Sequence, residues 1–126
     1  MDVILNIGLA NNPRGVRGSL EVLNFYGLVP VENQLLDSDT EPTLVVTVHT
    51  GELPVDVPPS LAIYKTSQAL NQDCIAAYIP EQGAVRAPVG RLIGPRADKW
   101  GPFNPEFFLM PDGSRLSDSQ PAAKAA

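Results

Sequence analysis

The sequence feature that most constrains the fold is the run TLVVTVHT at residues 43–50. It is the densest β-branched stretch of the chain and lies between Pro42 and Gly51, which is typical of a strand inside a sheet. Side chains alternate along a strand, so the run has two faces. One face carries Leu44, Val46 and Val48, and the other carries Thr43, Val45, Thr47 and His49. We expect the first face to meet a core and the second to be only partly covered.

The residues before this run predict a strand, a loop and a helix. Residues 3–9 alternate, with apolar odd-numbered side chains that should face the core. Residues 11–18 hold two glycines and a proline, which resist a helix and predict a loop. A short helix is then expected over residues 19–26, with Ser19 as its N-cap.

The following elements complete a recognisable order. Residues 29–37 predict a second strand, joined to the central run by a turn at residues 38–42, so the two should pair antiparallel. A second helix should begin with Ser60 as its cap and end near Asn71. Residues 74–79 form a compact apolar run, which predicts a fourth strand. The order β-α-β-β-α-β indicates an α+β, ferredoxin-like fold with the first and third strands at its centre.

The C-terminal third extends this pattern. Residues 84–93 predict a hairpin strand that its proline and glycine confine to a sheet edge. Residues 94–100 can hold one helical turn, and residues 100–110 carry four of the eight aromatic residues, so this segment must pack on something. We expect one α+β domain over residues 1–116 and a flexible tail over residues 117–126.

Charge and composition exclude several classes of function. Nine Lys and Arg against fourteen Asp and Glu give a net charge of -5, which argues against direct binding of nucleic acid. No apolar run approaches the roughly 18 to 20 residues that a membrane span needs, and the N-terminus lacks the features of a secretory signal. The single cysteine, Cys74, is consistent with a reducing compartment, so a cytoplasmic protein is expected.

Metal and cofactor sites are not expected. With one histidine and one cysteine, the remaining possibility is an all-oxygen site from Asp37, Asp39 and Glu41. These residues lack the glycine that a calcium loop requires, so a solvated acidic turn is the favoured interpretation. The glycine motifs that cradle phosphates are also missing.

Catalysis is not favoured either. Cys74 lies in an apolar run and is expected to be an inert core residue. His49 lies at the open end of the central run, where a general-base role stays open, although a lone strand histidine is more often held by a neighbour.

The open sheet face needs a cover. Its outward positions are Ile4, Asn6, Val45, Thr47 and His49, and none is a ring on which RNA bases could stack. Residues 100–110 folding back, or a second copy in a homodimer through the sheet, could cover it. The first is favoured.

Four stretches carry a resemblance: LNIGL at residues 5–9, DTEPTLV at 39–45, QDCIA at 72–76 and WGPFNPEFF at 100–108. Together they resemble a group of small hypothetical proteins from proteobacteria and their phages and plasmids. The resemblance implies an accessory protein of a mobile element, a class in which small acidic folds often bind and block a host protein.

We therefore expect a non-catalytic protein that binds and modulates another protein, such as a phage- or plasmid-encoded inhibitor of a host defence or regulatory component. Its expected contact residues are Asp37, Asp39, Glu41, Trp100, Phe103 and Phe107, which offer carboxylates to arginines and aromatic anchors. The alternative is a small-molecule-binding protein or enzyme with a pocket between the open sheet face and the C-terminal segment. His49 and Glu41 would be the polar groups of that pocket.

Overall fold

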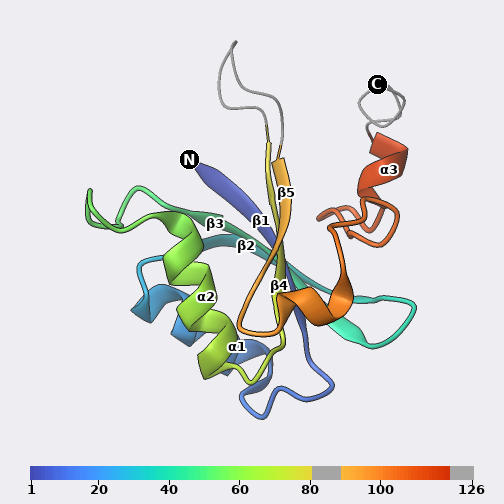
Figure 1. Ribbon diagram of the computed structural model, residues 1–126, viewed down its shortest axis with the longest axis horizontal. Coiled ribbons are helices and arrows are strands. Elements are labelled where there is room, and N and C mark those ends of the chain that lie inside the picture. The colour runs from blue at the N-terminus through green and yellow to red at the C-terminus, as the bar shows by residue number, and fades with distance from the viewer. Residues whose placement is uncertain (81–88, 120–126) are drawn as a thin grey trace.

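The computed structural model describes residues 1–80 and 89–119, and these form a mixed α+β structure around one five-stranded antiparallel sheet. The elements in chain order are β1 (Asp2–Gly8), α1 (Gly15–Phe25), β2 (Val29–Asp37), β3 (Pro42–His49), α2 (Pro59–Ala69), β4 (Ile75–Ile79), β5 (Val89–Ile93), the 3-10 helix η1 (Ala97–Trp100) and α3 (Leu116–Ser119). The strand order is β2-β3-β1-β4-β5. Figure 1 shows α1 and α2 on one side of the sheet and the C-terminal segment on the other.

The valine-rich run lies inside the sheet, as its composition predicts. β3 pairs with β1 from Thr43 to His49, with Leu5 opposite Val46, and pairs with β2 on its other side. β1 in turn pairs with β4. The predicted strand at residues 29–37 agrees with β2 residue for residue, and its antiparallel pairing with β3 is confirmed.

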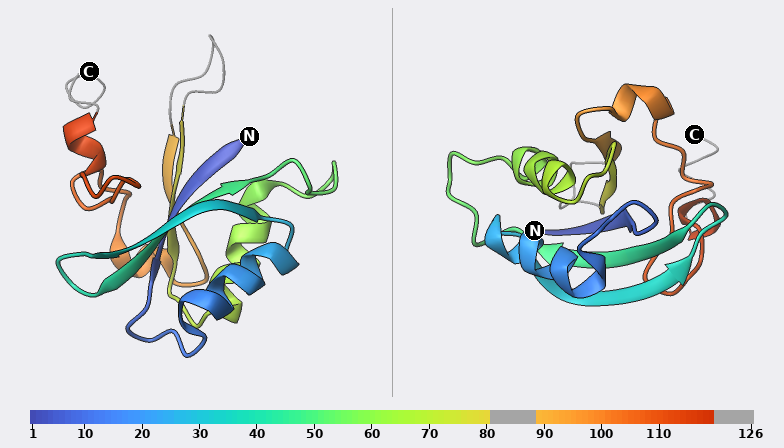
Figure 2. Two further views of the ribbon diagram at one scale, coloured as in Figure 1. Left: turned by 180° about the vertical axis from the view of Figure 1, so that it is seen from behind. Right: turned by 90° about the horizontal axis from the view of Figure 1, so that it is seen from below.

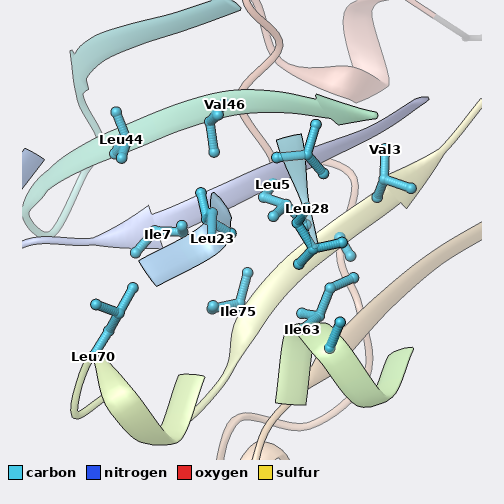
Figure 3. Packing of buried hydrophobic residues seen from close by; sticks show 13 residues of the cluster. Val3, Leu5, Ile7, Leu23, Leu28, Leu44, Val46, Ile63, Leu70 and Ile75 are labelled. Atoms are coloured by element: carbon cyan, nitrogen blue, oxygen red, sulfur yellow. The ribbon is translucent and has the colours of Figure 1, made fainter. Parts of the chain in front are cut away.

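The helices cover one face of the sheet with a continuous apolar core. The odd-numbered residues of β1 point into it, as predicted, and meet Leu44, Val46 and Val48 of β3. Figure 3 shows side chains from α1, α2 and β4 closing around these residues. Full burial of one such side chain contributes roughly 1.5–3 kcal/mol, so this layer stabilises the fold more than any surface contact.

The first helix begins four residues earlier than predicted. α1 starts at Gly15, and Ser19 lies buried within it instead of capping it. The Ser19 hydroxyl donates to the Gly15 carbonyl oxygen (2.6 Å) and accepts from Asn12 Nδ2 (2.8 Å). Asn12 Oδ1 accepts the Arg14 N–H (3.0 Å), so Asn12 organises this turn. Packing against the sheet therefore outweighs the low helix propensity of the two glycines.

The predicted cap of the second helix is also wrong. α2 begins at Pro59, with Pro58 in the cap position and no side-chain hydrogen bond there, so Ser60 lies in the first turn. Proline suits this place because the first helical N–H groups have no partner within the helix.

The second sheet face is covered by residues 100–110, which we call the aromatic segment. A separate apolar cluster forms there from Ile4, Val45, Tyr78, Phe108, Leu109 and Leu116. Asn6 of β1 holds the segment by its main chain: Asn6 Nδ2 donates to the Leu109 carbonyl oxygen (2.9 Å), and the Leu109 N–H donates to Asn6 Oδ1 (2.8 Å). The expectation that this segment covers the face is confirmed, and Figure 2 shows it opposite the helices.

The edge strand and the ends of the chain follow the predictions in part. β5 pairs with β4 at the sheet edge as expected, and η1 is the expected single turn. Residues 84–88 of the predicted strand lie outside the described residues, as do residues 120–126 of the predicted tail. Residues 117–119 belong to α3. None of the helices within residues 1–80 and 89–119 has the length and hydropathy that crossing a membrane requires.

The contact between Asn6 and Leu109 generates a stability prediction. Replacing Asn6 with Leu keeps the shape of the side chain but leaves two main-chain groups of Leu109 without their partners. We expect Asn6→Leu to lower the free energy of unfolding by about 2–4 kcal/mol, measured by urea denaturation. The control is Asn33→Leu on exposed β2, which should change it by less than about 0.5 kcal/mol. Equal losses in the two variants would contradict the assigned role of Asn6.

Candidate functional site

A pocket of about 580 Å³ lies between the second sheet face and the aromatic segment. Its walls are formed by residues of the strands, of the loops between elements and of the aromatic segment. The lining residues are Asn6, Gly8, Asn11, Thr40, Glu41, Asn71, Gln72, Asp73, Cys74, Ala76, Leu92, Trp100, Pro102, Phe103, Asn104, Phe107 and Phe108. We call it the aromatic pocket.

Small residues on the strands leave room for this pocket. Ala76 of β4 and Gly8 of β1 line it, so the sheet surface is low where the segment passes over it. Gly90 of β5 lies directly under the ring of Phe103, and a Cβ at that position would meet the ring edge. A glycine on the edge strand therefore allows Phe103 to lie close to the sheet.

The aromatic residues divide into anchored and exposed rings. Phe108 is buried, with its ring centroid 5.4 Å from that of Phe103 and 5.9 Å from that of Tyr78. Trp100 and Phe107 also line the pocket but remain 61% and 65% exposed. The pocket therefore has two fixed rings and two rings that present apolar surface to solvent.

Asp73 ties η1 to the loop that precedes β4. Its carboxylate accepts hydrogen bonds from Arg96 Nε, from Trp100 Nε1 (3.0 Å) and from Lys99 Nζ (3.3 Å). The hydrogen bond from Arg96, followed by that from Trp100, lowers the pKa of Asp73 from 3.8 to about 2. The main chains of the two segments also lie close together at Gly94. A Cβ at that position would collide with the main chain of Asp73 and Cys74.

The polar end of the pocket is built from three loops. Glu41, from the turn between β2 and β3, accepts the Ala10 N–H at Oε1 (3.1 Å). Asn71 follows α2 with φ +56° and donates from Nδ2 to the Asn11 carbonyl oxygen (3.2 Å). Gln72 beside it is 9% exposed. This end of the pocket thus presents amide groups and one carboxylate, whereas the other end presents rings.

The structure brings together four of the predicted contact residues. Glu41, Trp100, Phe103 and Phe107 all line the aromatic pocket. Asp37 and Asp39 do not line it. Arg115 Nη2 donates to both carboxylate oxygens of Asp39, each at 3.1 Å, and this ion pair links the turn between β2 and β3 to the chain after the aromatic segment.

The predicted pairing of His49 with Glu41 in one pocket is wrong. Glu41 directly precedes β3 and His49 is its last residue, so eight residue steps of extended chain separate them by about 26 Å. His49 Nδ1 instead lies 2.9 Å from Asp2 Oδ1, at an exposed strand end. The alternation of side chains along a strand does not show which end of the strand a pocket occupies. The aromatic segment packs over the end near Glu41, so the pocket lies there and not beside His49.

Cys74 lies at the edge of the pocket and is half-buried. Burial, followed by the nearby negative charge of Asp73, raises the pKa of its thiol, which disfavours the reactive thiolate. Within residues 1–80 and 89–119, no group of three His, Cys, Asp or Glu side chains is placed to hold a metal ion.

Sequence reasoning missed Gln72 and Asp73 as pocket residues. Asp73 meets partners 23 to 27 residues further along the chain, so no local pattern signals the contact. The available signal was indirect: three polar residues, Asn71 to Asp73, separate a helix from an apolar strand.

The Asp73 contacts generate a pH prediction that Trp100, the single tryptophan, can report. Because the pKa of Asp73 is lowered in the folded protein, the anchor is fully present above pH 3.8 and is lost as the pH falls through about 2. We expect tryptophan emission to change in that window, with Asp73→Asn showing the released emission already at pH 7. Asp98→Asn, an exposed carboxylate of η1, is the control and should behave as the natural chain. An unchanged pH profile in Asp73→Asn would contradict the assignment.

The pocket therefore has an apolar, aromatic part and a polar, acidic part. Comparisons with protein families, with curated proteins and with solved structures find no match for this chain.

Proposed function

We propose that this protein is a non-catalytic binding protein whose aromatic pocket receives a side chain or short segment of a partner protein. The observation that carries the proposal is the convergence of Glu41, Trp100, Phe103 and Phe107 on one pocket. Glu41 comes from the turn between β2 and β3 and the three rings come from the aromatic segment, so they are brought together only by the fold. Pockets lined by rings with a few placed polar groups are typical of recognition sites.

The exposure of the two outer rings supports a protein partner. Trp100 and Phe107 expose 61% and 65% of their surface beside a pocket, where aromatic anchors dominate the energy of many interfaces. A protein that covered both rings would gain apolar burial that the isolated chain lacks. The net charge of -5 would favour a partner with a basic surface.

We further propose that the partner is a host defence or regulatory component and that the protein inhibits it in the cytoplasm. The resemblance to small proteins of proteobacteria, phages and plasmids supports this, together with the small size and negative charge. We also propose that β1 to β4 with α1 and α2 represent a ferredoxin-like arrangement extended by β5. The element order and the antiparallel order β2-β3-β1-β4 support that proposal.

Binding of a small molecule is the second candidate function. Its support is the volume of about 580 Å³, which falls within the range of roughly 300–1,000 Å³ typical of small-molecule pockets. Glu41 would be a polar contact for such a molecule, whereas His49 lies too far away to be another.

The proposed function predicts which rings matter for partner capture. Affinity capture from host lysate, followed by quantitative mass spectrometry, should enrich a protein whose recovery falls roughly tenfold or more with Trp100→Ala or Phe107→Ala. The matched control is Phe25→Ala on α1, a ring that is 81% exposed and does not line the pocket. All three rings are mostly exposed, and Phe107→Ala leaves the hydrogen bond from Trp100 to Asp73 intact, so loss of capture in Phe107→Ala does not reflect loss of that anchor.

Two outcomes would separate the candidates. A captured protein that survives both pocket variants, or is lost equally with Phe25→Ala, would contradict binding through the aromatic pocket. If no protein depends on the pocket, while native mass spectrometry finds a bound small molecule that Trp100→Ala releases, the second candidate replaces the first.

A further inference from the structure

The polar end of the aromatic pocket contains two acceptor oxygens side by side above Gly8. A Cβ placed on Gly8 would lie 2.9 Å from Gln72 Oε1 and closer still to Glu41 Oε1. The two oxygens come from different elements, since Glu41 belongs to the turn before β3 and Gln72 to the loop after α2. The absence of a side chain at Gly8 therefore leaves the space in which they meet.

Gln72 is held so that its oxygen faces this space. Its Nε2 donates to the carbonyl oxygens of Leu70 (3.2 Å) and Asn71 (3.4 Å), which uses the donors of the amide. Gln72 is only 9% exposed, yet within the described part of the chain no donor reaches its Oε1. The oxygen is not among the enclosed side-chain atoms without a partner in the described residues, so it is open to the pocket and can accept from a donor that a ligand supplies.

Glu41 at this end of the pocket has no cationic partner among the described residues, and the hydrogen bond that its Oε1 accepts comes from the Ala10 main-chain N–H. Asp73, the other carboxylate of the pocket, is held by Arg96 and Lys99. The ion pairs within residues 1–80 and 89–119 do not include Glu41. A carboxylate beside an amide oxygen offers acceptors alone, and an organic cation is the group that offers donors alone.

We propose that Glu41 and Gln72 form a subsite for an ammonium or guanidinium group, supplied by a lysine or arginine side chain of the partner protein. The rings of Phe103 and Phe107 line the same pocket and accept the apolar stem behind that charge. This inference rests on the proposed function, because it names the group that the partner inserts. A free amine with an apolar body carries the same chemistry and is the other source to distinguish.

The first test uses three probes of similar shape and different charge on the purified protein. These are 2-phenylethylammonium, the neutral 2-phenylethanol and the anionic 3-phenylpropionate. Two-dimensional NMR should show 2-phenylethylammonium shifting the side-chain amide signals of Gln72, with the alcohol binding at least roughly tenfold more weakly and the anion not detectably. Equal binding of the three probes would overturn the proposal.

The second test uses isosteric variants. Glu41→Gln removes the charge and should weaken 2-phenylethylammonium binding by roughly tenfold, and Gln72→Met should weaken it by removing the amide acceptor. The control Asp37→Asn removes an exposed carboxylate outside the pocket and should bind as the natural chain does. Unchanged affinity in folded Glu41→Gln would overturn the proposal, whatever the behaviour of Gln72→Met.

A displacement experiment on the captured protein identifies the source of the cation. If a partner side chain occupies the subsite, 2-phenylethylammonium should release the captured protein, whereas 3-phenylpropionate should not. Binding of the amine without such release would overturn the assignment to a partner side chain. If Trp100→Ala loses the captured protein while the three probes bind equally well whatever their charge, the proposed function stands. That result would overturn only the cation subsite.

Discussion

The two hydrogen bonds between the Asn6 side chain and the main chain of Leu109 are the interaction on which the site depends. An amide offers a donor and an acceptor in fixed directions, so one side chain of β1 binds the aromatic segment much as a neighbouring strand would. Phe108 is then buried against Tyr78, while Trp100 and Phe107 remain at the surface. The pocket lies between the sheet and the segment that Asn6 holds in this way.

The two faces of the sheet are covered by different physical means. On the helical face, apolar side chains from two amphipathic helices form one continuous core. On the other face, a segment with little regular structure is held by a smaller apolar cluster and by polar contacts of Asn6, Asp73 and Asp39. Polar anchoring leaves space between the anchors, because hydrogen bonds fix points and not surfaces. That space is the aromatic pocket.

The sheet was largely predictable and the helix starts were not. β-branched runs, alternation and bounding prolines located β2 and β3 to within a residue, since these signals depend on side chains that are adjacent in sequence. The start of α1 was misplaced because Asn12 and Ser19 bond to each other across a turn, and packing overrode the glycines. For the site, the ring-bearing residues and Glu41 were foreseeable, whereas Gln72 depends on a loop geometry that local patterns do not encode.

By itself, the sequence determined the strands, the interior place of the valine-rich run and the need for residues 100–110 to pack against the sheet. Each of these follows from the periodicity and burial of apolar side chains, which are local properties. Only the tertiary structure decided that the side-chain oxygens of Glu41 and Gln72 both lie above Gly8, while His49 lies at the far end of β3. Such contacts join residues distant in sequence, and their geometry exists only once the whole chain has packed.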